Sequence, residues 1–114
     1  MKNTLSNFSS LPSSIGQLRN LETLNLKYTE KLQHLPEEIG NLKSLVTLKL
    51  SESSISSLPP SIGGLGCLVE LDLSESSISS LPSSIGKLKN LETLSLTYTK
   101  KLHHLPEEIG NLKS

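Results

Sequence analysis

Leucine, isoleucine and proline recur along this chain at a regular spacing that divides it into units of nearly equal length. Each unit opens with a Leu-Pro dipeptide, which begins at Leu11, Leu35, Leu58, Leu81 and Leu105. Successive dipeptides are 24, 23, 23 and 24 residues apart. A fixed period of roughly 20 to 50 residues is typical of proteins built from stacked structural repeats.

The repeat predicts that residues 1–114 form one array rather than several domains. The full units are 11–34, 35–57, 58–80 and 81–104, and partial units occupy 1–10 and 105–114. Counted back from Leu11, Met1 falls at the position of Leu48 and Leu71, so the chain is expected to begin within a strand.

Two periodicities alternate inside each unit. Leucines two residues apart, such as Leu24 and Leu26, predict a short strand with both side chains on the inner face. The segment "LPxxIGxLxxL" follows and predicts a short helical turn that opens at proline and points its isoleucine inward. The glycine after each isoleucine either ends that turn or lets the backbone pass close to its neighbour. We therefore expect an α/β solenoid, with a short parallel β-sheet on the concave face and short helical or 3-10 turns on the convex face.

The residues between the inward leucines are predicted to form the concave surface, the default binding face of such a fold. The candidates, unit by unit, are Thr23, Asn25, Lys27 and Tyr28, then Thr47, Lys49 and Glu52, then Glu70, Asp72 and Glu75, and finally Thr93, Ser95 and Tyr98. Tyr28 and Tyr98 either flank a polar binding patch or are frame residues copied by duplication, and the second interpretation is favoured. Lys49 and Asp72 are expected to face each other on adjacent strands.

Composition narrows the possible functions. The formal net charge is zero, so composition gives no support for binding to nucleic acid or to a membrane surface. His34 and His104 occupy equivalent positions three units apart, too far to share a metal ion. No group of nucleophile, base and metal ligands appears, so we expect no enzyme activity, cofactor or metal. A single cysteine, Cys67, cannot form an internal disulfide and favours a cytoplasmic setting; we expect it in a half-buried slot.

A longer repeat is superimposed on the short one. Residues 81–114 match residues 11–44 at all but six positions, and none of the six is a leucine, isoleucine, proline or glycine of the repeat. This pattern indicates recent duplication or deliberate consensus construction.

The segments "LPSSIGxLxNLETLxLxYT" and "LDLSESSISSLPSSIG" resemble leucine-rich repeats of plant intracellular immune receptors, the nucleotide-binding NLR class. They are also similar to the plant intracellular Ras-group repeat proteins. Receptor repeats usually have cysteine where this chain has Thr29 and Thr99. This difference suggests an engineered or consensus version of the repeat. It also lacks the "GxxxxGK[ST]" phosphate loop, so the resemblance implies a sensing or scaffold surface and not signalling.

One column of hydroxyl residues has a structural interpretation. Leucine-rich repeats commonly place asparagine there, and its amide bonds the backbone of adjacent coils. A hydroxyl can donate one such bond, and we expect a structural ladder at Thr29, Ser53, Ser76 and Thr99. A catalytic serine is not indicated, because no base repeats beside these residues.

The sequence thus predicts a non-enzymatic module or scaffold that binds a protein or peptide of unknown identity. The alternative is a building block that associates with itself through uncapped ends. The last unit would expose Leu105, Ile109 and Leu112, and an uncovered strand edge invites pairing with another chain.

Overall fold

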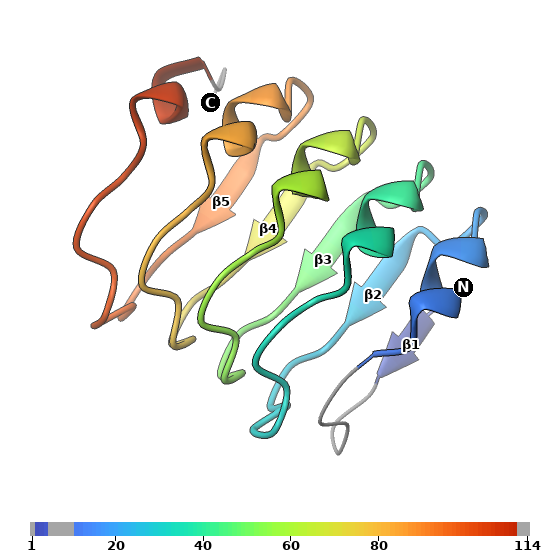
Figure 1. Cartoon of the computed structure of the whole chain (residues 1–114), viewed down its shortest axis with the longest axis horizontal. Coiled ribbons are helices and arrows are strands. Elements are labelled where there is room, and N and C mark those ends of the chain that lie inside the picture. Colours follow the sequence, from blue (N-terminus) through green and yellow to red (C-terminus); the bar gives the residue numbers. More distant parts are fainter. Residues whose placement is uncertain (1, 5–10, 112–114) are drawn as a thin grey trace.

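The computed structural model describes residues 2–4 and 11–111, which wind into the predicted solenoid (Figure 1). Each coil contributes one strand to one side of the molecule and one 3-10 helix to the other. The strands are β1 (Lys2–Thr4), β2 (Thr23–Asn25), β3 (Thr47–Lys49), β4 (Glu70–Asp72) and β5 (Thr93–Ser95). The 3-10 helices are η1 (Ser13–Gln17), η2 (Glu37–Asn41), η3 (Pro60–Gly64), η4 (Ser83–Lys87) and η5 (Glu107–Asn111). Within the described residues no helix has the length and apolar character needed to cross a bilayer.

The strands form one parallel sheet in the order β1-β2-β3-β4-β5. Its register places equivalent positions of successive units opposite each other, so Leu48 pairs with Leu71 and Lys49 with Asp72. The prediction for the start of the chain was wrong by two residues, because Asn3, not Met1, lies at the position of Leu24. Leu11 follows Asn3 by eight positions, whereas Leu58 follows Leu48 by ten, so this stretch of sequence is two residues shorter.

Stacked leucines and isoleucines fill the space between the sheet and the 3-10 helices. Leu24, Leu48 and Leu71 have no exposed surface, nor have Ile39 and Ile62 on the opposite side. Burying each such side chain contributes about 1.5–3 kcal/mol. Leu94 on β5 and Leu96 just after it are only partly buried, since β5 pairs with β4 alone among the described strands.

Proline starts each 3-10 helix from the position before its first residue. Pro12, Pro36, Pro59 and Pro82 have extended backbones with ψ of 152–157°. The carbonyl of Pro36 accepts the first hydrogen bond, from the Ile39 N–H at 3.0 Å. Proline therefore sets the direction of entry and leaves its own missing N–H outside the helix.

Glycine follows the isoleucine of each 3-10 helix because adjacent coils approach closely there. No described glycine has a positive φ. A Cβ built at Gly40 would lie 2.5 Å from the Ser61 carbonyl oxygen, and one at Gly63 would lie 2.8 Å from the Ser84 oxygen. Of the two roles that the sequence left open, the structure supports the close approach of neighbouring backbones.

We predict that Gly40→Ala lowers the free energy of unfolding by about 1–3 kcal/mol, because its methyl group overlaps the backbone of the next coil. Gly66→Ala is the matched control, since a Cβ there meets no atom within 4 Å. It should leave stability unchanged or raise it by about 0.4–1 kcal/mol. Urea denaturation followed by circular dichroism measures both, and equal losses would contradict the close-approach explanation.

Candidate functional site

The outward positions of the strands form two rows across the concave sheet. The first row contains Thr23, Thr47, Glu70 and Thr93, and the second contains Asn25, Lys49, Asp72 and Ser95. Neighbours within a row are one strand spacing apart, about 4.8 Å. Most of these side chains are partly exposed, because inward leucines alternate with them along each strand. The structure thus brings the predicted strand candidates together on one face.

A further row follows the strands, and its backbone geometry is unusual. Tyr28, Glu52, Glu75 and Tyr98 have φ values of 65°, 57°, 56° and 57°, in the left-handed region that favours glycine. We call these four residues the rim. The sequence predicted their side chains on the binding face but gave no sign of this conformation, because none of them is glycine or asparagine.

The rim backbone belongs to the hydrogen-bond ladder between coils. The N–H groups of Tyr28, Glu52 and Glu75 donate to the Ser51, Ser74 and Thr97 carbonyls at 3.1, 3.0 and 2.8 Å. These three rim residues are therefore fixed by the next coil while their side chains remain exposed. Left-handed backbone in residues other than glycine costs about 1–3 kcal/mol each and persists only where neighbouring structure imposes it.

Short polar side chains at the strand ends start the turn that leads to the rim. Asn25 Oδ1 accepts the Lys27 N–H at 3.1 Å, and Asp72 Oδ1 accepts the Ser74 N–H at 3.0 Å. The Ser74 hydroxyl also donates to Asp72 Oδ1, at 2.7 Å. Lys49 and Asp72 are paired in register as predicted, while this carboxylate oxygen is engaged by its own turn.

Two exposed aromatic rings bracket two exposed carboxylates along the rim. Tyr28 is 55% exposed and Tyr98 is 74% exposed. Glu52 and Glu75, also exposed, stand between them on consecutive coils. The Lys27 ammonium lies 5.6 Å from the centre of the Tyr28 ring, within range of a cation–π interaction.

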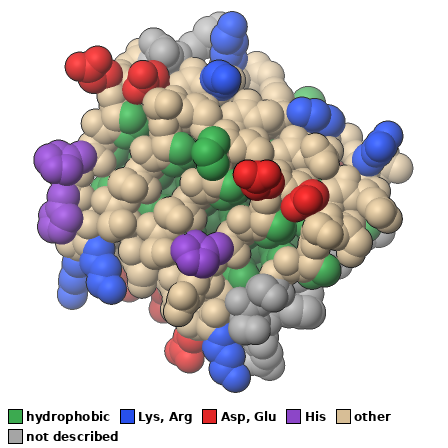
Figure 2. All heavy atoms as spheres, in the orientation of Figure 1, with side chains coloured by type: hydrophobic (Ala, Val, Ile, Leu, Met, Phe, Trp, Pro, Cys, Tyr) green, Lys and Arg blue, Asp and Glu red, His purple; other side chains and the backbone are tan. Residues whose placement is uncertain are grey.

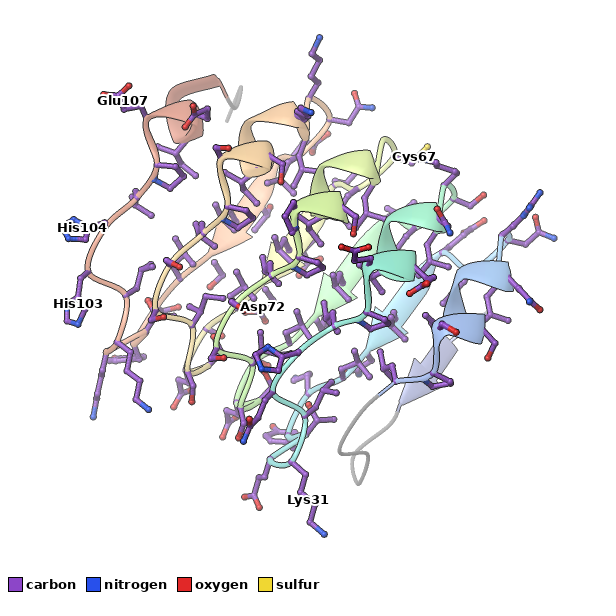
Figure 3. The ribbon with its side chains drawn as sticks, in the orientation of Figure 1. Lys31, Cys67, Asp72, His103, His104 and Glu107 are labelled. Atoms are coloured by element: carbon purple, nitrogen blue, oxygen red, sulfur yellow. The ribbon has the colours of Figure 1, made fainter. Side chains whose placement is uncertain are left out.

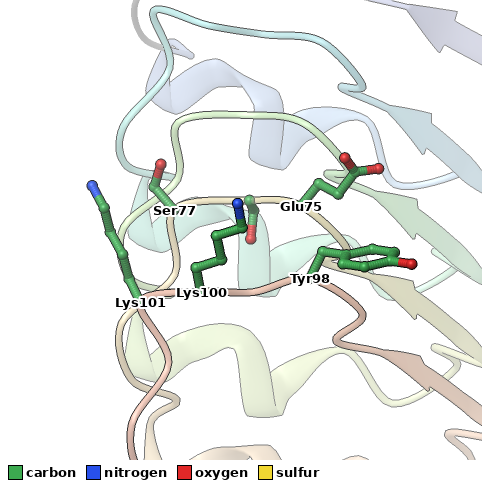
Figure 4. A pocket seen from close by; sticks show the side chains of 6 residues that line it. Glu75, Ser77, Tyr98, Lys100 and Lys101 are labelled. Carbon is green, nitrogen blue, oxygen red and sulfur yellow. The ribbon is translucent and has the colours of Figure 1, made fainter.

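The rim ends at an open hollow of about 390 Å³ between the last coils (Figure 4). Glu75, Ser77, Tyr98, Lys100 and Lys101 line it together with Ser76. The Tyr98 ring lies beside Glu75, and the two lysines rise from the strand-to-loop turn (Figure 4). Sequence reasoning did not select Ser77, Lys100 or Lys101. The available signal was the change from Glu30 to Lys100 between the duplicated segments, which reverses the charge at this position.

The expected ladder of hydroxyls does not join adjacent coils. The hydroxyls of Thr29, Ser76 and Thr99 donate to carbonyls of their own coils, those of Leu26, Leu73 and Leu96, at 2.7, 2.7 and 2.6 Å. Ser53 Oγ accepts the Ile55 N–H at 3.4 Å, again within its coil. The prediction failed because a hydroxyl is shorter than the asparagine amide on which it was based.

Other side chains provide the bonds between coils. The Ser61 hydroxyl donates to the Glu37 carbonyl at 2.6 Å, the Asn90 amide donates to the Gly66 carbonyl at 2.7 Å, and the Ser54 hydroxyl donates to the Glu30 carbonyl. These bonds connect the outer turns and loops, where the sequence offered no repeat-wide pattern.

Potential metal ligands are dispersed over the described part of the chain, where no three His, Cys, Asp or Glu side chains gather. His103 and His104 project from the last coil, and Cys67 lies on the turn between η3 and β4 (Figure 3). Cys67 is exposed, so its predicted half-buried slot was wrong. Cys67 lies in the turn that follows η3. The preceding residue, Gly66, has no side chain that could cover the thiol.

Comparison with known proteins identifies the family to which the chain belongs. A model described as "Leucine-rich repeat region" matches residues 13–114. The chain belongs to the leucine-rich repeat family. None of the curated proteins matches it.

Several solved leucine-rich repeat structures are similar to the chain. A leucine-rich repeat protein of Leptospira interrogans is 34% identical, with a TM-score of 0.72 over 100% of this chain and 34% of that one. The ectodomain of the Arabidopsis thaliana receptor kinase GASSHO1/SCHENGEN3, in complex with CASPARIAN STRIP INTEGRITY FACTOR 2, is 38% identical with a TM-score of 0.73. That match covers 92% of this chain and 13% of the ectodomain.

A plant peptide hormone receptor, RGFR1 in complex with RGF2, is 33% identical with a TM-score of 0.68. It covers 90% of this chain and 21% of the receptor. The leucine-rich repeat chain thus spans about a third or less of the length of these solved chains.

We predict that Glu75→Gly raises the free energy of unfolding by about 0.5–1 kcal/mol, because glycine adopts the rim conformation without the side-chain penalty. Glu70→Gly removes the same charge from strand β4, where the backbone is extended, and should lower stability by about 0.5–1 kcal/mol. Urea denaturation compares the two variants. Loss of stability in both would show that the rim carries no backbone strain.

Proposed function

We propose that this leucine-rich repeat chain is a non-enzymatic interaction module that binds an extended peptide segment along its rim. The observation that carries the proposal is the exposed order Tyr28, Glu52, Glu75 and Tyr98, one residue per coil. Aromatic side chains supply much of the binding energy at protein interfaces, and here two of them stand exposed at the ends of one row.

Charge indicates which peptide fits. Glu52 and Glu75 stand between the tyrosines, and Glu70 and Asp72 lie on the adjoining strand positions, where Lys49 is the one basic residue of the two rows. The centre of this surface is therefore acidic. A ligand with a basic residue at its centre is electrostatically complementary and is guided into register by that charge.

Spacing defines the ligand further. Tyr28 and Tyr98 are three coils apart, or roughly 14 Å at about 4.8 Å per strand. Four residues of extended peptide also span roughly 14 Å, and side chains at i, i+2 and i+4 point to the same side. The rim thus suits apolar or aromatic residues at i and i+4 with an arginine or lysine at i+2.

The similar receptors support a peptide as the ligand class. Two of them were solved in complex with RGF2 and with CASPARIAN STRIP INTEGRITY FACTOR 2. From these receptors we infer only that the ligand is a peptide. We do not infer a particular peptide, because the surface residues of this chain differ from theirs.

The origin of the array is part of the proposal. The plant-type frame favours a relationship to NLR receptor repeats, and threonine at 29 and 99 favours a consensus or engineered version. An exposed free thiol at Cys67 suits a reducing, cytoplasmic environment.

We expect an extended peptide with phenylalanine at i and i+4 and arginine at i+2 to bind measurably in isothermal titration calorimetry. Tyr28→Ala and Tyr98→Ala should each weaken binding about tenfold, the effect of an interface anchor worth about 1.4 kcal/mol. His34→Ala, an exposed change on the return loop, should have no effect.

Two control peptides make the test specific. Glutamate at i+2 should abolish binding through repulsion from Glu52 and Glu75, and moving the second phenylalanine to i+5 should weaken it by turning one ring away. Equal affinity of all three peptides for the chain would contradict binding at the rim. So would equal affinity of the first peptide for the parent chain and for both tyrosine variants.

A second candidate function is end-to-end self-association, which the last described coil favours. Leu105 is 51% exposed, and Leu94, Leu96, Leu102 and Ile109 are only partly buried. The outer edge of β5 has no partner strand among the described residues. Leu112, also expected to be exposed, lies outside the described residues. This surface could pair with the β1 side of a second copy in a head-to-tail arrangement.

If the ends associate, light scattering across a concentration series should show a rising mean mass for the unmodified chain. Leu105→Lys should suppress that rise by placing a charge on the apolar surface. Cys67→Leu is the control for nonspecific hydrophobic association, since it places an apolar side chain at an exposed position on an interior coil. A constant monomer mass at high concentration would rule out self-association.

A further inference from the structure

The third unit departs from the others on the side that carries the 3-10 helices. After the isoleucine and glycine, the neighbouring units place Asn41 with Lys43, or Lys87 with Lys89, where this unit has Gly64 and Gly66. Neither glycine has a positive φ, and a Cβ at Gly66 would meet nothing within 4 Å. Backbone conformation does not require these two glycines, and what they change is the surface, because they remove two polar side chains.

A hollow of about 340 Å³ lies beside the first of these glycines, Gly64, and is lined by residues of η2, η3 and η4. Glycine backbone at Gly40, Gly63 and Gly64 forms much of its wall. Lys43 and Lys87 are its charged lining residues, and no acidic side chain lines it. Basic side chains are spaced along the upper edge of this face, the edge that carries the 3-10 helices (Figures 1 and 2).

One of the two ammonium groups is held in position. Lys43 Nζ donates to the Gly64 carbonyl at 2.9 Å, so the side chain reaches from one coil to the next. A Cβ at Gly64 would lie 3.3 Å from that nitrogen and 3.0 Å from the Gly40 oxygen. Glycine at 64 therefore leaves room for the ammonium group. Lys87 occupies the position of Gly64 in the following coil and lines the hollow from the other side.

We propose that this hollow binds a phosphate-type anion between Lys43 and Lys87. The lysines belong to coils two spacings apart, roughly 10 Å. A tetrahedral dianion presents oxygens in both directions and carries charge for two cations, whereas a carboxylate directs both oxygens to one side. Lysine acts as a point charge toward phosphate and needs no planar partner.

The adjoining hollows are less suited to an anion. Lys87 and Lys89 line one of them, but the Glu108 carboxylate lines it too. Arg19 and Lys43 line another, but the Lys43 ammonium is turned from it toward the Gly64 carbonyl. The central hollow alone among these three combines two cations, glycine walls and an ammonium fixed inside it.

An NMR titration of the full 15N-labelled chain tests the site at constant ionic strength. Sodium phosphate should shift the amide signals of Gly63 and Gly64 in a saturable way, and sodium acetate should do so more weakly. Glycerol phosphate should match inorganic phosphate if a monoester is accepted; binding of inorganic phosphate alone would restrict the site to the free ion.

Variants identify the residues responsible. Lys43→Gln and Lys87→Gln should each weaken phosphate binding about tenfold, the loss of one charge-assisted hydrogen bond. Lys31→Gln makes the same charge change on a loop at the opposite edge (Figure 3) and should leave binding unchanged. Gly64→Asn, which restores the residue found at Asn41, should also weaken binding by filling the hollow.

Three results would overturn the proposal: no saturable shift at Gly63 and Gly64, equal shifts with acetate, or equal weakening by Lys31→Gln and Lys43→Gln. Both lysine side chains are exposed, so the test does not depend on Gly64→Asn remaining folded. Unchanged amide spectra away from the hollow show that the lysine variants keep their fold. The outcome of this test is independent of the proposed peptide binding, which uses the rim.

Discussion

Backbone hydrogen bonds between neighbouring coils are the interaction on which this leucine-rich repeat structure depends. Leu26, Leu50 and Leu73 donate their N–H groups to the next coil at 2.8, 2.7 and 2.9 Å. Each strand has only three residues, and a strand that short has no independent stability. Stacking both pairs these strands and buries the leucines beneath them, so a coil is stable only beside its neighbours.

The same bonds determine where the functional candidates stand. They hold Tyr28, Glu52 and Glu75 in a backbone conformation that side chains disfavour, and they keep the rim at one residue per coil. On the other side, close approach of the 3-10 helices requires glycine at Gly40 and Gly63. Regular stacking therefore creates two distinct surfaces, an acidic rim between aromatic rings and a basic hollow walled by glycine.

The sequence predicted those features that repeat in every unit. The Leu-Pro spacing located strands and helical turns, and the two-residue period separated inward leucines from outward residues such as Lys49 and Asp72. It did not predict the conformation of the rim, because neither tyrosine nor glutamate at these positions signals a positive φ.

Features that depend on distances between coils were also beyond the sequence. The path of Lys43 to Gly64 and the hollow beside Lys100 arise from how coils approach each other. A zero net charge likewise gave no sign of the local groupings, with Glu52 and Glu75 on consecutive coils of the rim and Lys43 and Lys87 lining one hollow. The additional glycines of the third unit were visible in the sequence. The hollow beside them could not be predicted, because it also depends on where the lysines of the two adjacent coils lie.

Native-state hydrogen exchange tests most directly whether stacking between coils holds the rim in place. The amides of Glu52 and Glu75, whose side chains are exposed, donate to the next coil at 3.0 and 2.8 Å. They should be protected as strongly as the amides of Leu50 and Leu73 in the same ladder and should open with them as denaturant is added. Unprotected exchange at Glu52 and Glu75, beside protected Leu50 and Leu73, would show that the rim is not fixed by its neighbours and would contradict the account.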